Sequence, residues 1–252
     1  MASAATSIPT LVGVGVGPGD PELITMKAVR VLDDADVILV PSTEASADDA
    51  GRAERLVLAA CPSAEAKLRR IPFSMAQRRG VGTKRRKSWE ASAQAAVEAF
   101  EDGARTVAFA TVGDPSVYST FSYLAAHVRA AVPDLEVVVV PGITAMQALA
   151  AASLTPLVEG TESLALVPVT AGLDGVAAAL DVADTVVAYK GGRQLPELLE
   201  LIRRHDRRGV LGVSVGLPGQ TLTPLDQVDG EAAPYFSTVL IAPARTQTGG
   251  RL

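Results

Sequence analysis

The chain has 252 residues, 48% of them hydrophobic and 20% charged, which is enough apolar material for a packed core and argues against disorder or a coiled coil. One cysteine and two histidines exclude a disulfide framework and a metal site built from several Cys or His ligands. The formal net charge is −5, and the length suits one large domain or two domains of about 110–130 residues each.

Strand-like apolar runs alternate with helix-like runs through the first part of the chain. Asp20 is a candidate helix N-cap, and Pro21 fits the first helical position. The alternation predicts a parallel, helix-covered α/β sheet. The predicted strands are 9–16, 36–41, 66–73, 105–111 and 135–141, and the predicted helices are 21–35, 52–61, 88–103 and 119–132.

The segment from Val137 to Val158 carries no charge and is long enough to span a bilayer. Because Pro141, Gly142 and Pro156 interrupt it, we expect a buried strand, a tight turn and a small-residue helix instead. The sequence therefore predicts no membrane segment here.

A second α/β pattern follows the polar, turn-rich span 155–162. We expect two domains, residues 1–142 with the first glycine-rich loops and residues 143–252 with the second sheet. The predicted strands of the second domain are 162–169, 184–190, 209–216 and 235–243, and its later helices are 174–181 and 195–205.

The positive charge gathers in one segment. Residues 67–89 hold nine Lys and Arg and no acid, which leaves 14 of the 23 cations against 28 Asp and Glu elsewhere. A solvated basic loop and a site for a polyanion are both open interpretations. Nucleic acid is disfavoured, because Phe73 and Trp89 are the only aromatic residues in the segment.

Three predicted strands end in turns of glycine, proline and small polar residues. They are the GVGVGPGD run at 13–20, the GDPSVYST run at 113–120 and the PGITA run at 141–145. The first does not match the dinucleotide-binding pattern GxGxxG. Each turn alone could be a simple chain reversal, but together they predict a site lined by backbone groups, since ligands bind at the carboxyl ends of strands in open α/β sheets.

One catalytic motif is present by coincidence. Residues 212–216 fit the GxSxG pattern of α/β hydrolases, which need a histidine after the serine in chain order. Both His127 and His205 precede Ser214, so we expect Ser214 to be an ordinary strand residue.

The chain resembles the tetrapyrrole methylases, S-adenosylmethionine-dependent enzymes that modify uroporphyrinogen and corrin precursors. The motifs that carry the resemblance are GVGPGDPELITMKAVRVLDDADVILVP at 15–41, GDPSVYSTFSYL at 113–124 and PGITAMQALAA at 141–151. The second motif, with VGLPGQ at 215–220, is most similar to the precorrin-2 and cobalt-factor II C20-methyltransferase branch. The resemblance implies a two-domain α/β fold with S-adenosylmethionine in the inter-domain cleft, and a homodimer.

The resemblance also implies site residues. We expect Asp114 to be catalytic: its carboxylate could orient the macrocycle or take the proton lost from the methylated carbon, and the alternative role is to cap a helix. Pro41 stands where several relatives have an Asp, which removes one proton acceptor, and Lys190 stands where some have Met. The implied cofactor contacts are Pro18, Val112, Gly113, Asp114, Val117, Thr144, Ala145, Lys190, Val215 and Gly216, and the implied substrate-carboxylate contacts are Arg78, Arg79, Arg85 and Arg86.

The expected function is methylation of C20 in precorrin-2 or cobalt-factor II during cobalamin biosynthesis. A methylase acting at C11 or at C2/C7, an rRNA or diphthine methyltransferase, and a non-catalytic module for an acidic partner are the alternatives. No metal is expected, because the sulfonium group is already an activated methyl donor. The single thiol Cys61 and an opening without a signal-peptide pattern predict a cytoplasmic protein. The few aromatic residues of the basic segment and the interrupted apolar segment predict neither a nucleic-acid nor a membrane partner.

Overall fold

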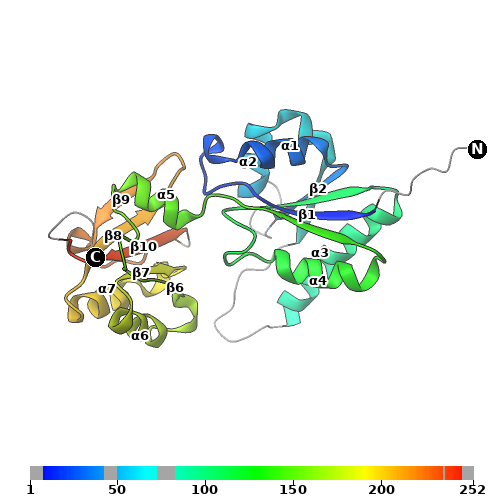
Figure 1. Cartoon of the computed structure of the whole chain (residues 1–252). Helices are drawn as coiled ribbons and strands as arrows, with labels where there is room; N and C mark the ends of the chain where they lie inside the picture. Colours follow the sequence, from blue (N-terminus) through cyan, green and yellow to red (C-terminus); the bar gives the residue numbers. More distant parts are fainter. Residues whose placement is uncertain (1–7, 43–49, 73–82, 235, 246–252) are drawn as a thin grey trace, which may run out of the picture. The chain divides into compact units, whose positions relative to one another are not determined.

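The computed structural model describes residues 8–42, 50–72, 83–234 and 236–245 (Figure 1). The chain divides into two compact units, Met1–Thr144 and Ala145–Leu252. Each unit contains its own five-stranded sheet and its own hydrophobic core. The prediction of an α/β fold is confirmed, while the assignment of independent domains at 1–142 and 143–252 stays a prediction.

Unit 1 is built on a parallel sheet with the strand order β3-β2-β4-β1-β5. All four strand pairings are parallel, as the alternation of strands and helices predicts. The central strands are buried on both faces and consist almost entirely of apolar residues, as parallel sheets require. The strands are β1 (Thr10–Gly15), β2 (Val37–Ser42), β3 (Leu68–Pro72), β4 (Thr106–Thr111) and β5 (Glu136–Val140).

Two pairs of helices cover the faces of this sheet (Figure 1). Helices α1 (Met26–Asp34) and α2 (Arg52–Ala60) pack on the face that carries Val12 and Val14. Helices α3 (Thr83–Glu101) and α4 (Phe121–Ala131) pack on the opposite face, with Leu11 and Phe109. Successive residues of a strand point to opposite faces, so one apolar strand supplies both cores.

The predicted helix at 21–35 is two helices. Asp20 accepts a hydrogen bond from the Glu22 amide at 2.9 Å and caps only a short 3₁₀ helix, Pro21–Leu23. Helix α1 has its own N-cap, because the Thr25 hydroxyl accepts a bond from the Ala28 amide at 3.1 Å. The single long helix expected from apolar spacing is therefore wrong.

Helix α3 begins at Thr83, five residues before the predicted start at Ser88. The added residues include Lys and Arg, which have good helix propensity but give no apolar periodicity for sequence analysis to detect. Part of the basic segment is therefore helical, and the interpretation of a wholly irregular basic loop is wrong for residues 83–87.

Unit 2 contains a mixed sheet with the order β6-β7-β10-β8-β9. The β6–β7 pair is parallel and the other three pairs are antiparallel. Strand β9 was not predicted, because it is a short run that ends in proline. The strands are β6 (Leu164–Pro168), β7 (Thr185–Tyr189), β8 (Arg208–Val213), β9 (Thr221–Pro224) and β10 (Ser237–Ala242).

Three helices cover the second sheet. Helices α6 (Asp174–Val182) and α7 (Leu195–Arg204) pack on one face through Leu180, Leu198 and other apolar residues. Helix α5 (Ala145–Ala152) packs on the other face through Leu149. The uncharged segment from Val137 to Val158 thus holds most of β5, a turn and α5, as predicted. The strand is not buried as expected: β5 lies at the edge of the sheet, and Val139 is exposed. In the part of the chain that the structure describes, no helix is long and apolar enough to cross a membrane.

A glycine in β1 leaves room for an aromatic ring. A Cβ atom added to Gly13 would lie 2.6 Å from the Phe121 ring, which belongs to the start of α4. We expect Gly13→Ala to lower the free energy of unfolding by about 1–3 kcal/mol, because overpacking displaces the ring or the strand. Urea denaturation measures this loss.

The matched control for this substitution is Gly175→Ala in α6. A Cβ there would lie at an ordinary 3.6 Å from Val167, so we expect no loss of stability. The double substitution Gly13→Ala with Phe121→Leu should cost less than the sum of the two single changes. Additive losses would contradict the packing interpretation.

Candidate functional site

Three loops meet at the carboxyl edge of the unit 1 sheet. Strands β4, β1 and β5 are neighbours, so the turns that follow them lie side by side. The Gly113 amide donates to the Gly17 carbonyl at 2.7 Å, and the Val16 amide donates to the Thr111 carbonyl at 2.9 Å. This edge is where open α/β sheets bind ligands.

The backbones of three glycines are in direct contact here. A Cβ atom on Gly15 would lie 2.6 Å from the Gly113 carbonyl oxygen and 2.6 Å from the Gly142 amide nitrogen. A Cβ atom on Gly142 would lie 2.2 Å from the Gly113 oxygen. Any side chain at Gly15 or Gly142 would therefore separate the loops, which explains these glycines by packing.

Gly113 has a second requirement. Its φ of +75° lies in the left-handed region, which favours glycine. A side chain there would meet nothing closer than the Thr144 Cα atom at 4.0 Å. The space beside Gly113 is thus open, and a ligand could approach the backbone at this point.

Asp114 links two of the loops. One carboxylate oxygen accepts the Ser116 amide at 2.8 Å and the Ser116 hydroxyl, and the other accepts the Gly142 amide at 2.9 Å. The residue is only 7% exposed. Burial by itself raises the pKa of Asp114, but these hydrogen bonds outweigh it and hold the pKa below its ordinary value. A carboxylate that is bonded at both oxygens and has a low pKa is a weak proton acceptor.

Tyr118 lies on the same loop in a strained conformation. Its φ is +52°, which is rare for an aromatic residue, and it is 40% exposed. The loop is fixed on the following side, because the Ser119 hydroxyl lies 3.1 Å from the Thr111 hydroxyl and accepts the Phe121 amide. Burial raises the pKa of Tyr118, so its phenol stays protonated at neutral pH. Tyr118 was not a predicted site residue, since no sequence signal marks a positive φ at an aromatic residue.

Unit 2 gathers strand ends in a similar way. Strands β6, β7 and β8 run in the same direction, so their carboxyl ends share one edge. The Tyr189 hydroxyl accepts the Met146 amide at 3.0 Å, which joins the end of β7 to the start of α5. Lys190 follows with a φ of +60°, which is another strained position.

The turn after β8 shows that the expectation for Ser214 is wrong. The strand ends at Val213, and Ser214 has a φ of +51° in the turn that follows. Its amide donates to the Phe236 carbonyl at 3.0 Å. Gly216 also has a positive φ, and its amide donates to the Gln220 side chain at 2.8 Å. Period-two apolar spacing could not reveal where the strand stops.

The predicted cofactor residues fall into two groups, each at the carboxyl edge of its own sheet. Their role in binding stays a prediction. Within unit 1 the group consists of Pro18, Val112, Gly113, Asp114, Val117 and Thr144, and within unit 2 it consists of Ala145, Lys190, Val215 and Gly216.

The basic segment separates into two parts. Arg70 makes a bidentate ion pair with the buried Glu54, with both N···O distances at 2.9 Å. Arg69 lies 3.8 Å from Asp102, and Lys67 donates to the Asp33 carbonyl. These cations are engaged by the protein itself, so they are not a uniform surface for a polyanion.

The predicted substrate-binding arginines lie later in the basic segment, after β3. Arg78 and Arg79 lie outside the described residues, and so does the side chain of Arg85. Arg86 is exposed on the first turns of α3. Helix α3 follows β3 and runs back along the sheet, so its start lies at the carboxyl edge. A substrate role for these residues stays a prediction.

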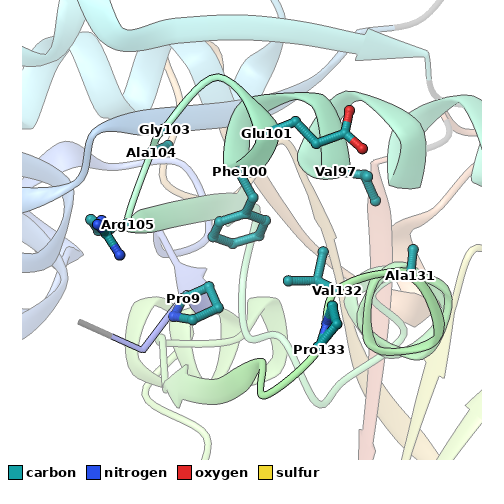
Figure 2. A pocket seen from close by; sticks show the side chains of 10 residues that line it. All are labelled: Pro9, Val97, Phe100, Glu101, Gly103, Ala104, Arg105, Ala131, Val132 and Pro133. Carbon is teal, nitrogen blue, oxygen red and sulfur yellow. The ribbon is translucent and has the colours of Figure 1, made fainter. Parts of the chain in front are cut away.

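Two hollows differ in place and size. A hollow of about 430 Å³ lies at the amino edge of unit 1, between the ends of α3 and α4, where Phe100 faces Pro9 and Val132 (Figure 2). It is remote from the strand ends that carry the candidate site. A much smaller hollow, about 10 Å³, lies at the carboxyl edge beside Pro41 and Trp89.

Within the described residues no group of three or more His, Cys, Asp or Glu could hold a metal ion.

Comparison with known proteins gives consistent relatives. The family model for tetrapyrrole (corrin/porphyrin) methylases matches residues 10–229. The precorrin-2 C(20)-methyltransferase of Sinorhizobium sp is 35% identical, over 92% of this chain and 94% of that protein. Cobalamin biosynthesis protein CobIJ of Mycobacterium bovis is 32% identical over 94% of this chain, and the chain spans 46% of that relative's length.

Solved structures show the same fold. Uroporphyrin-III C-methyl transferase from Thermus thermophilus, complexed with S-adenyl homocysteine, has a TM-score of 0.64 at 23% identity. The match covers 92% of this chain and 97% of that one. At this level of identity the likeness establishes the fold.

The hydrogen bonds of Asp114 predict a stability defect in Asp114→Asn. An amide has one acceptor oxygen, so its NH₂ group must face either the Gly142 amide or the Ser116 donors. We expect the free energy of unfolding at pH 7 to fall by about 1–3 kcal/mol in urea denaturation. Ser116→Ala, which removes the hydroxyl donor and keeps the amide, should cost less.

The pH dependence of this defect follows from the lowered pKa. The stabilisation by Asp114 is present above the unfolded-state pKa of about 3.9 and is lost as the pH falls through the lower folded-state pKa. The stability difference between wild type and Asp114→Asn should therefore shrink at acid pH. A difference that stays constant from pH 7 to pH 3 would contradict this interpretation.

Proposed function

The chain belongs to the tetrapyrrole (corrin/porphyrin) methylases, and on this basis we propose that it transfers a methyl group from S-adenosylmethionine to C20 of precorrin-2 or its cobalt complex. The observation that carries the proposal is the match to a precorrin-2 C(20)-methyltransferase over nearly the whole of both chains. A match of that extent includes the strand-end loops as well as the scaffold. This methylation would be a step of cobalamin biosynthesis.

The glycine-rich strand ends suit a nucleoside cofactor. The space beside Gly113 is open, since a Cβ atom added there would lie 4.0 Å from the Thr144 Cα atom. A ligand can therefore approach the backbone where a side chain would otherwise stand. The predicted contacts in unit 2 lie around the apolar cluster that includes Ala145 and Val215. The cofactor supplies an activated methyl group on a sulfonium, so the protein has to position the acceptor carbon and exclude water. Positioning alone can lower such a barrier by about 7–11 kcal/mol.

We infer that Asp114 is a positioning residue in this reaction. Its two oxygens already accept hydrogen bonds from the loops that they hold, and Pro41 supplies no carboxylate at the end of β2. The proton that leaves the methylated carbon would then pass to solvent or to one of the substrate's own carboxylates. A positioning role would then replace the proton-accepting role expected from the sequence.

The remaining parts of the proposal concern assembly and surroundings. We propose two domains with the cofactor between them, a homodimer and a cytoplasmic location, as expected for the resemblance and for a lone buried thiol. We also propose a polycarboxylate substrate and neither a nucleic-acid nor a membrane partner; the exposed Arg86 guanidinium is suited to pair with a substrate carboxylate.

The first test is cofactor binding without metal. Calorimetry with S-adenosylhomocysteine in the presence of a chelator should give saturable heat for the wild type. Gly142→Ala should abolish or strongly weaken binding, because its Cβ would force the three loops apart. Gly103→Ala at the other edge, where a Cβ meets nothing within 4 Å but φ is +99°, controls for stability loss without disturbing the site. Binding that appears only after metal is restored would overturn the proposal.

The second test identifies the product. Methyl-labelled S-adenosylmethionine should transfer label to precorrin-2 or to its cobalt complex, and NMR of the product should place the methyl group on C20. A methyl group at C11 or at C2 or C7 would keep the family and refute the position. Transfer to ribosomal RNA or to a protein, with none to a macrocycle, would refute the substrate class.

A further inference from the structure

The small hollow at the carboxyl edge of unit 1 marks a second feature of this edge. It lies over the ends of β2 and β3, between Pro41, Pro72, Trp89 and Thr120. Its volume, about 10 Å³, is at the lower limit for a single water molecule. A ligand here would lie across the surface of these residues and not inside the hollow.

An aromatic pair stands beside this hollow. The rings of Trp89 on α3 and Tyr123 on α4 are stacked, with centroids 4.3 Å apart and planes inclined by 10°. Tyr123 is 44% exposed, and Trp89 is partly exposed. The stack therefore joins the two helices and also leaves aromatic surface open at the edge where the candidate site lies.

The start of α3 is held firmly against the sheet. The hydroxyls of Ser88 and Ser92 both donate to the Pro72 carbonyl, at 2.8 and 2.9 Å. Ser92 is buried, and its hydroxyl also bonds the Ser88 carbonyl. Trp89 is thus fixed at the end of β3. Arg86 precedes Trp89 by three residues, which places both on the same side of the helix, and it is exposed.

We propose that Trp89, Tyr123 and Arg86 form a substrate subsite for a flat conjugated ring that carries carboxylates. The ring packs over the exposed aromatic surface, and a peripheral carboxylate pairs with the Arg86 guanidinium. Stacked aromatic surface favours a flat π-system, and a guanidinium binds carboxylate through two parallel hydrogen bonds. This subsite rests on the proposed function, because it assigns part of the tetrapyrrole to named residues.

Two stable porphyrins separate the two contributions. Uroporphyrin carries eight carboxylates and coproporphyrin carries four on the same ring. Their dissociation constants are measured by calorimetry for the full chain and its variants, together with that of S-adenosylhomocysteine. Trp89→Leu and Tyr123→Leu should weaken both porphyrins alike, by about 2- to 12-fold, the range for one aromatic pair. Trp89→Phe keeps an aromatic face and should retain most of the affinity.

Arg86→Gln should act on charge alone. It should weaken uroporphyrin by about two- to fivefold and coproporphyrin by less, as expected for one exposed ion pair. Arg129→Gln, which makes the same charge change on the exposed surface of α4 near its end, should leave both constants unchanged. Phe100→Leu is the matched aromatic control, since it lies on α3 at the amino edge (Figure 2).

The outcomes distinguish a substrate role from simple helix packing. If the Trp89–Tyr123 stack only joins helices, the leucine variants will melt at lower temperature and bind both porphyrins as the wild type does, which overturns the subsite. Equal weakening of porphyrin and S-adenosylhomocysteine would show general damage and would also overturn it. Normal methylation of precorrin-2 with unchanged porphyrin binding in the variants would refute the subsite and leave the proposed function standing. A wild-type chain that binds S-adenosylhomocysteine but no macrocycle would refute both.

Discussion

Backbone contact between Gly15, Gly113 and Gly142 is the constraint on which the rest of unit 1 depends. These residues end or follow three neighbouring strands, and no Cβ atom fits between them at Gly15 or Gly142. The carboxylate of Asp114 reinforces the contact by accepting hydrogen bonds from two of the three loops. Rigid backbone at the carboxyl edge of a parallel sheet is what a methyl transferase needs, because its catalysis consists largely of positioning.

The strand-end loops are accompanied by residues with strained backbone angles and by exposed aromatic side chains. Tyr118 in unit 1 has a strained φ angle and neighbours Val117, which the resemblance assigns to the cofactor; in unit 2, Lys190 is itself assigned to the cofactor and is strained as well. Such angles persist only where the surrounding structure enforces them, and they are common at functional sites. On the other side of the unit 1 edge, two serine hydroxyls fix the start of α3 and hold the lone tryptophan against Tyr123. Backbone groups and aromatic surface are therefore both fixed before any ligand binds.

The cations of the basic segment that the structure describes fall into two groups, those paired within the protein and those exposed on α3. Arg70 and Glu54 form a bidentate pair between β3 and α2, which secures the edge strand of the sheet. Arg86 is carried on α3 and is exposed. Composition alone treats these cations as one cluster, whereas the structure places Arg70 on a strand beside Glu54 and leaves Arg86 exposed on a helix. A buried carboxylate beside Arg70 is what separates them, since it would be costly to leave Glu54 without a cation.

The sequence by itself determined the family through motifs that resemble those of known proteins. It also determined the parallel sheet of unit 1 and the three strand-end turns, because apolar period, glycine and proline are local signals that the chain carries at each position. It did not reveal that α3 starts at Thr83, because the Lys and Arg there give no apolar period. Nor did it reveal that β9 exists or that Ser214 leaves the strand, since these depend on neighbours distant in the chain. Only the tertiary structure decided the role of the glycines, which meet across three loops, and the bonding of Asp114 to Gly142, 28 residues away. Contacts of this kind arise from how strands are ordered in the sheet, and a single sequence carries no local signal of that order.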